Sequence, residues 1–443
     1  MAMRKLEKYP KYKESGVEWI GEIPEGWNLV PIRAIFSERN EKNSGIKTDY
    51  ILSVTKDRGV IPYDEKGALG NNKSEDIEKY KLVYPNDFVI NKMNVVIGSL
   101  GMSKYYGAFS HVYLVYRPYS ENVHIEYFSY VFHNPVFYKS LIRICTGIME
   151  LRESLNKDEF KKELLPFPSY NEQIKIAKYL DQKTAQIDKA ITLKEQLIEK
   201  LKERRQILIN DAVTKGLDPN VKMKESGVEW IGEIPEGWEV KKFRFLFNFS
   251  KGLNITKENL QEEGIPCVNY GEIHSKYGFE LDPEIHPLKC VSKEYLKTSD
   301  KSFLKKGDFI FADTSEDIEA SGSFTYLKSE VPTFAGYHTI ITRLKKPMVN
   351  RYIAYFFDSD AFRDQVRQKV KGVKVYSITN NILKETLVCL PQLEEQQKIV
   401  KYLDKKNKKL DQIIVLEQQQ IEKLKEYKAT LIDSVVTGKV RVV

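Results

Sequence analysis

Short loops rich in lysine, arginine, asparagine and serine could bind nucleic acid. They follow predicted strands in two separate parts of the chain and also contain glycine and aromatic residues. Arginine and asparagine side chains read guanine and adenine edges, while lysines and the backbone amides of glycine loops hold phosphates. A single loop of this kind is usually a solvated turn, so only the set of loops indicates a binding surface. The candidate DNA contacts are Lys56, Arg58, Lys92, Asn94, Ser99, Ser103, Lys104, Lys251, Asn254, Asn269, Tyr270, Thr314, Lys371 and Lys374.

The sequence contains no recognised catalytic motif. It has no GxxxxGK[ST], GxGxxG, HExxH or GxSxG string. It also lacks the Asp/Asn-Pro-Pro-Tyr/Phe string that amino-methylating enzymes place at their target base. The six histidines show no metal-ligand spacing. Two of them, His111 and His338, occupy matching places in the two parts of the chain, which favours a structural role. We therefore expect no catalytic residue, metal or cofactor in this chain.

The composition is that of a globular protein with a mild basic bias. The 443 residues include 70 basic and 62 acidic side chains, a formal net charge of +8. This charge is compatible with nucleic acid but does not require it. Four scattered cysteines without a CxxC spacing are expected to be reduced thiols. No apolar run reaches the roughly 18 residues of a membrane span and no signal-peptide pattern is present, so we expect a cytoplasmic protein.

Two internal repeats divide the chain into matching halves. The string KESGVEWIGEIPEGW, called the marker below, occurs at residues 13–27 and again at 224–238. A helical segment at 173–214 is similarly repeated at 396–437. The markers contain all four tryptophans and a Pro-Gly turn, so each is expected to fix the entry of the chain into the following domain. Their identity also leaves open a second role, in which one partner species binds at two equivalent places.

The repeated helical segments carry a heptad pattern. Mostly apolar positions recur in a 4-3 alternation, the seam of a coiled coil. Helices with so narrow a stripe need a partner, and each repeat is the obvious partner of the other. Either direction of pairing brings Lys194 near Glu417, but only the antiparallel direction gives a closed pseudo-twofold arrangement. That direction also brings Asn407 toward Arg205. The predicted seam residues are Leu180, Ile187, Ile191, Lys194, Ile198, Leu201, Leu208, Leu403, Leu410, Ile414, Glu417, Ile421, Leu424 and Leu431.

The alternative is that each long helix packs independently on its own domain.

Between the repeats lie two divergent regions, called body 1 (28–168) and body 2 (239–391) below. Both read as mixed α/β, and an Asp-Phe pair precedes a predicted strand in each, so we expect one fold with two different surfaces. The predicted strands are 50–55, 87–92 and 112–118 in body 1 and 265–271, 307–314 and 338–344 in body 2. The predicted short helices lie near 125–137 and 351–362.

This organisation resembles the specificity subunit of type I restriction–modification enzymes. The paired IGEIPEGW markers and the two long helices that open on EQxxIxxYLD carry the resemblance, which covers essentially the whole chain. It implies an α+β fold with two homologous target recognition domains, each reading one half of a bipartite asymmetric DNA site. It also implies an antiparallel coiled coil that sets the spacer and docks methyltransferase subunits. The expected domains are 1–168 (target recognition domain 1), 169–215 (first long helix), 216–391 (linker and target recognition domain 2) and 392–443 (second long helix and C-terminal tail).

The resemblance further implies the partners. These are double-stranded DNA, two methyltransferase subunits that carry S-adenosylmethionine and the adenine-N6 chemistry, and restriction subunits that use ATP and Mg²⁺. The chain itself would be non-catalytic. Two rival functions are a coiled-coil scaffold, which would show no salt-dependent DNA binding, and a methyltransferase fused to its own recognition domain, which the missing motifs argue against. For the favoured function we expect half-site centres about one helical turn, near 10 base pairs, apart.

Overall fold

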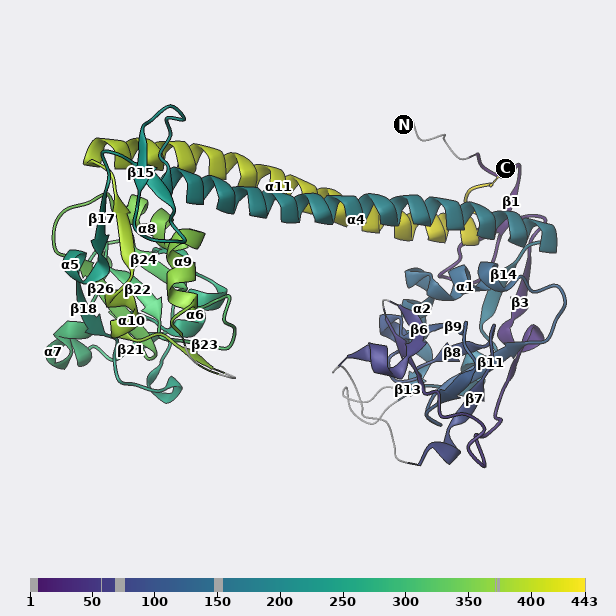
Figure 1. Cartoon of the computed structure of the whole chain (residues 1–443). Helices are drawn as coiled ribbons and strands as arrows, with labels where there is room; N and C mark the ends of the chain where they lie inside the picture. Colours follow the sequence, from purple (N-terminus) through teal and green to yellow (C-terminus); the bar gives the residue numbers. More distant parts are fainter. Residues whose placement is uncertain are drawn as a thin grey trace. The chain divides into compact units, whose positions relative to one another are not determined.

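The computed structural model describes residues 7–56, 58–67, 76–146, 154–370, 372 and 375–442. The chain forms two compact units (Figure 1). Unit 1 comprises Met1–Glu195 and Gln418–Val443, and unit 2 comprises Gln196–Glu417. Each unit therefore holds one marker, one body and half of each long helix, whereas the expected domain limits fall at the helix ends.

Two long helices carry the heptads. They are α4 (Tyr170–Thr214) and α11 (Leu393–Val436), with 45 and 44 residues. Each contains no proline or glycine and each is followed by a left-handed glycine, Gly216 with φ 76° and Gly438 with φ 75°. Glycine ends helices in this way because it has no Cβ to oppose a positive φ. In each unit, one half of α4 lies against one half of α11 (Figure 1).

Body 1 is built on a four-stranded antiparallel sheet with the order β4-β11-β8-β9. Alternate residues of these strands face opposite sides. Phe88 of β8 stacks on Phe132 of α1 with ring centroids 3.9 Å apart, while Val89 packs in a separate cluster with β5 and β6. The sheet strands and the helix on this face are β4 (Phe36–Glu38), β8 (Phe88–Ile90), β9 (Leu100–Met102), β11 (Leu114–Pro118) and α1 (Ile125–His133).

The other elements of body 1 and its marker are short. The strand pairs are β1 (Tyr12–Glu14) with β2 (Glu22–Pro24), β3 (Asn28–Pro31) with β14 (Leu164–Phe167), β5 (Leu52–Thr55) with β6 (Gly59–Pro62), β7 (Lys81–Val83) with β10 (Gly107–Phe109), and β12 (Cys145–Thr146) with β13 (Ser154–Leu155). The remaining α-helices are α2 (Pro135–Ser140) and α3 (Lys157–Phe160). The three strands predicted from the sequence correspond to β5, β8 and β11.

Body 2 repeats this frame and adds a strand. Its sheet has the order β18-β26-β22-β24-β20, so β18, β26, β22 and β24 take the places of β4, β11, β8 and β9. The extra edge strand β20 pairs in parallel with β24, while the other pairs are antiparallel. The sheet strands are β18 (Phe247–Lys251), β20 (Phe279–Leu281), β22 (Phe309–Ala312), β24 (Phe324–Leu327) and β26 (Thr339–Leu344).

The predicted strand 265–271 ends early because Asn269 begins a short helix, α6. The predicted helix near 351–362 is two helices, α8 and α9. The other elements of unit 2 are β15 (Met223–Glu225), β16 (Glu233–Pro235), β17 (Glu239–Lys242), β19 (Ile265–Val268), β21 (Cys290–Val291), β23 (Thr314–Ser315), β25 (Phe334–Ala335), β27 (Tyr376–Ser377), β28 (Leu387–Leu390), α5 (Phe243–Leu246), α6 (Tyr270–Ser275), α7 (Tyr295–Thr298), α8 (Asn350–Asp358), α9 (Asp360–Arg367) and α10 (Asn380–Lys384).

Each body is fastened to a long helix by an equivalent buried glutamine. Gln173 of α4 accepts a hydrogen bond from the amide that precedes α1 (2.9 Å) and donates to the carbonyl of the proline before α4 (3.0 Å). Gln396 of α11 likewise accepts from the amide that precedes α8 (3.1 Å) and donates to the proline carbonyl before α11 (2.9 Å). The repeated EQxxIxxYLD string therefore contains a side chain that locks each body to the start of its helix.

Each body also packs on the end of the other long helix. Tyr127 of α1 donates to the carbonyl of Val436 at the end of α11 (3.1 Å), and Tyr352 of α8 donates to the carbonyl of Val213 at the end of α4 (3.3 Å). Both tyrosines are fully buried in the hydrophobic cores that contain these helix ends. The two units therefore share one plan for body, marker and helices.

Candidate nucleic-acid interface

In body 2 the segments after three strands lie close together, although β19 and β25 belong to a three-stranded sheet and β22 to the five-stranded sheet. Strands β19 and β25 run parallel, and the amide of Gly336 donates to the carbonyl at the end of β19 (2.7 Å). Strand β22 joins them, because the amide of Asp313 just after it donates to the carbonyl of His338 (3.0 Å). Tyr270 and Thr314, two of the predicted contacts, follow β19 and β22 and so lie in the same region.

Aromatic and polar side chains gather in this region. The ring of Tyr270 lies 5.7 Å from that of Tyr337 and 5.4 Å from that of His338, between centroids. His338 Nδ1 is 3.1 Å from Asp313 Oδ1, and 55% of the His338 side chain is exposed. Bases stack on aromatic rings, and imidazole and carboxylate groups bond to base edges. We call Tyr270, Asp313, Thr314, Tyr337 and His338 the body-2 loop cluster.

The backbone of His338 supports a functional assignment for this cluster. Its φ is 55°, in the left-handed region that residues other than glycine seldom occupy. Such strained residues are often found at functional sites. The sequence indicated a structural role for His338 and did not single out Tyr337. His338 begins the predicted strand 338–344 and Tyr337 precedes it, so neither residue followed a predicted strand.

Lys251 and Asn254 lie in a segment beside the cluster. The amides of Gly252 and Leu253 donate to the carbonyls of residues 339 (3.1 Å) and 335 (2.8 Å). Gly252 allows this close approach, because a Cβ there would lie 1.9 Å from the carbonyl oxygen of Gly336. Lys251 and Asn254 are both exposed, as a DNA contact requires.

Asn269 is not on the accessible surface. Only 1% of it is exposed, and its backbone amide donates to Glu272 Oε2 (3.0 Å) at the start of α6. A Cβ on Gly336 would lie 1.9 Å from Asn269 Oδ1, so this side chain fills the space beneath the loop. We therefore revise the expectation for Asn269 from base contact to loop support. Lys371 and Lys374 lie outside the described residues.

In body 1 four of the predicted contacts fall in adjoining loops. The Ser99 hydroxyl donates to a carbonyl of β5 (3.1 Å), which joins the loop after β8 to the hairpin that carries Lys56 and Arg58. The carbonyl of Lys92 accepts from the amide of the last residue of β13 (2.8 Å). Lys56, Arg58 and Asn94 are exposed and Lys92 is half-buried. These four side chains therefore form a candidate contact surface for body 1.

Ser99, Ser103 and Lys104 do not belong to that surface. Ser99 and Ser103 are 5% and 1% exposed. The Ser103 hydroxyl donates to the carbonyl of Tyr105 (2.9 Å), so both hydroxyls bond within the fold. The amide of Ser103 donates to the carbonyl of Asp87, which places Ser103 and the exposed Lys104 at the opposite end of β8 from Asn94. Because they are buried, Ser99 and Ser103 are structural residues and not the DNA contacts that we expected.

The repeated Asp-Phe pair has a structural cause. Asp87 accepts from Arg39 Nε (2.7 Å) and Nη2 (3.1 Å), and Asp308 accepts from Arg343 Nε (2.7 Å). Each aspartate is 1% exposed and begins a central strand. Burial raises the pKa of Asp87, and the Arg39 guanidinium opposes that rise. Arg39 follows β4 whereas Arg343 lies in β26, so the two bodies supply the arginine from different strands.

The predicted seam residues of α4 and α11 are all buried or half-buried. In unit 1, Lys428 Nζ bonds to Asp188 (2.7 Å) and Lys194 Nζ donates to Gln420 Oε1 (2.6 Å). As the residue number rises along α4, the number of its partner on α11 falls, so the helices pair antiparallel in this unit.

In unit 2 the same direction holds. Arg205 pairs with Asp411, while a Cβ on Gly216 would lie 3.2 Å from Glu395 Oε1. The side-chain amide of Asn407 donates to the hydroxyl of Tyr355 in body 2 (3.4 Å). Asn407 lies one helical turn before Asp411, the partner of Arg205, and its expected approach to Arg205 stays a prediction.

Each marker packs on the end of a long helix. A Cβ on Gly438, after α11, would lie 2.4 Å from Pro24 and 3.1 Å from the Trp27 ring. A Cβ on Gly216, after α4, would lie 3.4 Å from the Trp238 ring. This packing uses equivalent residues in both units.

A surface hollow also borders each marker. The one beside the first marker has a volume of about 750 Å³ and is lined by Val17, Trp19, Val136, Ile142 and Arg143 among others. Val136 and Ile142 are 44% and 48% exposed. The hollow beside the second marker has a volume of about 400 Å³.

Two leucines at equivalent heptad positions point away from the seam. Leu193 in unit 1 and Leu416 in unit 2 both follow an isoleucine two residues earlier in the repeated pattern. They are 55% and 52% exposed.

In the described part of the chain, no group of three or more histidine, cysteine, aspartate or glutamate residues could hold a metal ion. Among the described residues no disulfide joins the cysteines, and burial raises the pKa of Cys267 and Cys389 to about 12. Among the described residues, no helix is long and apolar enough to cross a membrane.

Comparison with known proteins gives one consistent family. The family model described as type I restriction modification DNA specificity domain matches twice, at residues 24–203 and 235–426. The MjaVIII type I restriction enzyme specificity subunit of Methanocaldococcus jannaschii is 22% identical over 95% of this chain and 94% of its own length. The EcoKI specificity subunit of Escherichia coli K12 is 25% identical over 87% of this chain and 82% of its own length.

Solved structures agree on the fold. The HsdS subunit from Thermoanaerobacter tengcongensis matches with a TM-score of 0.53 at 13% identity, covering 96% of this chain and all of that one. A chain from work on complex assembly and conformational transition of the type I restriction–modification system matches with a TM-score of 0.69, also at 13% identity, covering 94% of this chain and 98% of that one.

Proposed function

Since the chain belongs to the type I restriction–modification DNA specificity family and is a non-catalytic, sequence-recognising subunit, we propose that each body reads one half of a bipartite DNA site. The observation that carries this proposal is one frame with two different loop sets. The strand order β4-β11-β8-β9 recurs as β18-β26-β22-β24. The loops at the ends of these strands differ in length, sequence and secondary structure.

The candidate reading surfaces differ in chemistry. Body 1 would present the exposed Arg58 and Asn94, with Lys56 and Lys92 at phosphates. The exposed guanidinium of Arg58 donates to the backbone carbonyl of Glu65. It also lies 3.6 Å from the Glu65 carboxylate. Such an exposed pair is weak, so DNA can replace it. Arginine to guanine and asparagine to adenine are the usual bidentate pairings.

Body 2 would read through its loop cluster, with Lys251 at a phosphate. Tyr270, Tyr337 and His338 offer rings and hydrogen-bonding groups, and Asp313 offers an acceptor for cytosine or adenine amino groups. Two surfaces of such different composition would recognise different half-sites, which makes the complete site asymmetric.

The long helices would set the spacer and dock two methyltransferase subunits. Antiparallel pairing within each unit gives the two units the same local structure. The exposed Leu193 and Leu416 at equivalent positions and the hollow beside each marker would then bind two copies of one partner. S-adenosylmethionine, ATP and Mg²⁺ would be used by the partner subunits, which supply the methylation and restriction chemistry.

A body exchange tests the proposal. The region 28–168 is replaced by the corresponding body of a relative with a different site, and genomic methylation is sequenced in cells with each gene. We expect one half of the methylated sequence to change and the other half to remain. A change in both halves, or in neither, would refute reading by separate bodies.

A further inference from the structure

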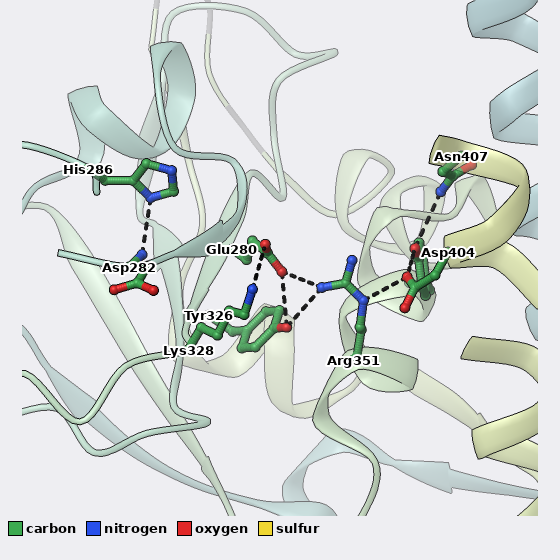
Figure 2. Close-up of polar contacts among 9 residues, drawn as sticks. Glu280, Asp282, His286, Tyr326, Lys328, Arg351, Asp404 and Asn407 are labelled. Atoms are coloured by element: carbon green, nitrogen blue, oxygen red, sulfur yellow. Dashed lines mark hydrogen bonds and ion pairs between the residues drawn. The ribbon is translucent and has the colours of Figure 1, made fainter. Parts of the chain in front are cut away.

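An arginine of body 2 bridges the edge of its sheet to helix α11. Arg351, at the start of α8, places Nε 2.7 Å from Asp404 Oδ1 on α11. The hydroxyl of Tyr355, one turn further along α8, donates to the same carboxylate oxygen (2.5 Å). Figure 2 shows the Arg351 side chain pointing toward Asp404. Helix α8 is thus held to α11 by a charged and a neutral hydrogen bond to a single carboxylate.

The opposite edge of the guanidinium faces the extra strand of body 2. Arg351 Nη1 contacts the carboxylate of Glu280 in β20 and lies 3.3 Å from the hydroxyl of Tyr326 in β24. Lys328 Nζ lies 3.4 Å from the other oxygen of Glu280 (Figure 2). Because a guanidinium is planar, its bonds to two carboxylates fix the angle between the elements that carry them. Arg351 therefore connects β20 to α11 through one rigid group.

The packing beneath Arg351 holds a strained residue in place. Phe279 of β20 has a φ of 73°, an outlier for a bulky side chain. Its ring lies 5.3 Å from the Arg351 guanidinium carbon and 4.9 Å from the Tyr355 ring centroid. Strained backbone persists only where surrounding contacts determine it. The conformation of β20 thus depends on its contact with α8.

Arg351 and Glu280 each hold the other in its charged form. Burial lowers the pKa of Arg351, but hydrogen bonds to Asp404 and Tyr326 outweigh it, and the net shift is upward. Burial raises the pKa of Glu280, but the charge of Arg351 outweighs it, and the net shift is downward. The side chains of Arg351 and Glu280 are 31% and 30% exposed, so solvent screens the group only in part.

The corresponding contact in body 1 has a different composition. Tyr130 donates to Asp181 of α4 (2.7 Å), as Tyr355 does to Asp404. The position of Arg351 is occupied by Glu126, whose side chain is 61% exposed and lies 3.4 Å from His124. The bridging arginine and the strand β20 to which it connects are therefore features of body 2, added to a contact that both bodies share.

We propose that Arg351 is a positioning residue that fixes the angle of body 2 on α11, so that the second half-site is read at one defined distance from the first. Arg351 lies outside the body-2 loop cluster and would not touch DNA. The proposal rests on the proposed function, because a fixed angle matters only if body 2 reads a half-site.

The test compares spacer tolerance in the complex of the full chain with its methyltransferase subunits. Methylome sequencing first gives the recognised sequence. Binding is then measured on duplexes whose spacer is unchanged, shortened or lengthened by one base pair. The test variants are Arg351→Met and Arg351→Lys, and the control is Arg343→Met, which removes an arginine–carboxylate pair inside body 2 that does not reach α11.

We expect the wild type and Arg343→Met to bind the altered spacers at least tenfold more weakly than the natural one, since half-site spacing is a geometric requirement. For Arg351→Met this penalty should fall to about threefold or less, with weaker binding to the natural spacer, because a loosened body samples more angles. Lysine keeps the charge but lacks the planar guanidinium. The spacer penalty of Arg351→Lys should therefore lie between those of the wild type and Arg351→Met.

An unchanged spacer penalty in Arg351→Met would overturn the proposal, and Arg351→Lys gives the same decision if the methionine variant does not fold. If the spacer penalty fell as much in Arg343→Met as in Arg351→Met, the proposal would also be overturned. General loosening of body 2 would then explain the effect. If the wild type itself recognises no bipartite site, the proposed function fails, and that result is distinct from either of these.

Discussion

Replacing Gln173 with alanine should weaken the attachment of body 1 to the start of α4. This fully buried side chain accepts from the His124 amide (2.9 Å) and donates to the carbonyls of Asn122 (3.1 Å) and Pro168 (3.0 Å). Each bond contributes about 1 kcal/mol net, so the three together contribute about 3 kcal/mol. A free-energy loss of that size raises the population of the locally open state about a hundredfold.

Hydrogen exchange followed by mass spectrometry measures this opening in each unit separately. We expect the amides of α1 to exchange about a hundredfold faster in Gln173→Ala, with unit 2 unchanged. Gln396→Ala removes the two equivalent bonds and should accelerate exchange in α8 by about thirtyfold. Gln182, an exposed glutamine of α4, is the matched control and should change exchange little when replaced by alanine. An acceleration below about fivefold in α1 would show that this hydrogen-bond reasoning is wrong.

Three further predictions concern DNA, partners and pH. Arg58→Ala should cost about 1–3 kcal/mol on the recognised site and little on other DNA, whereas Lys251→Ala should weaken binding to all sequences and lower the salt slope by about one, both measured by binding titrations. Leu193→Lys and Leu416→Lys should each remove one methyltransferase copy from the complex, which mass measurement in solution would show. Burial raises the pKa of Glu38, but lysines 157 and 161 outweigh it and the net shift is downward. A lowered pKa stabilises the folded state above the unfolded value of about 4.5. In thermal melts, Glu38→Gln should therefore be less stable than the wild type at pH 7, and the two should converge as the pH falls below that value.

The candidate contacts show how far sequence reasoning can reach. Loop composition led to Tyr270 and Thr314, which the structure brings together with His338. The same reasoning also selected Asn269 and Ser103, whose side chains are buried. Polar residues after a strand can face solvent or bond beneath the loop, and sequence spacing is the same in both cases. Only the packing of neighbouring strands distinguishes the two.

The sequence by itself determined the internal duplication, the two long helices with their seam, and the family. These features depend on local periodicity and repeated strings, which are readable along one dimension. Tertiary structure decided which residues bridge the body and the helix, such as Arg351 with Glu280 and Asp404. These three residues lie far apart in the chain, and no periodicity connects them. Tertiary structure also decided that Arg39 and Arg343 bind equivalent aspartates from different strands. A guanidinium on either neighbouring strand can reach the same buried carboxylate.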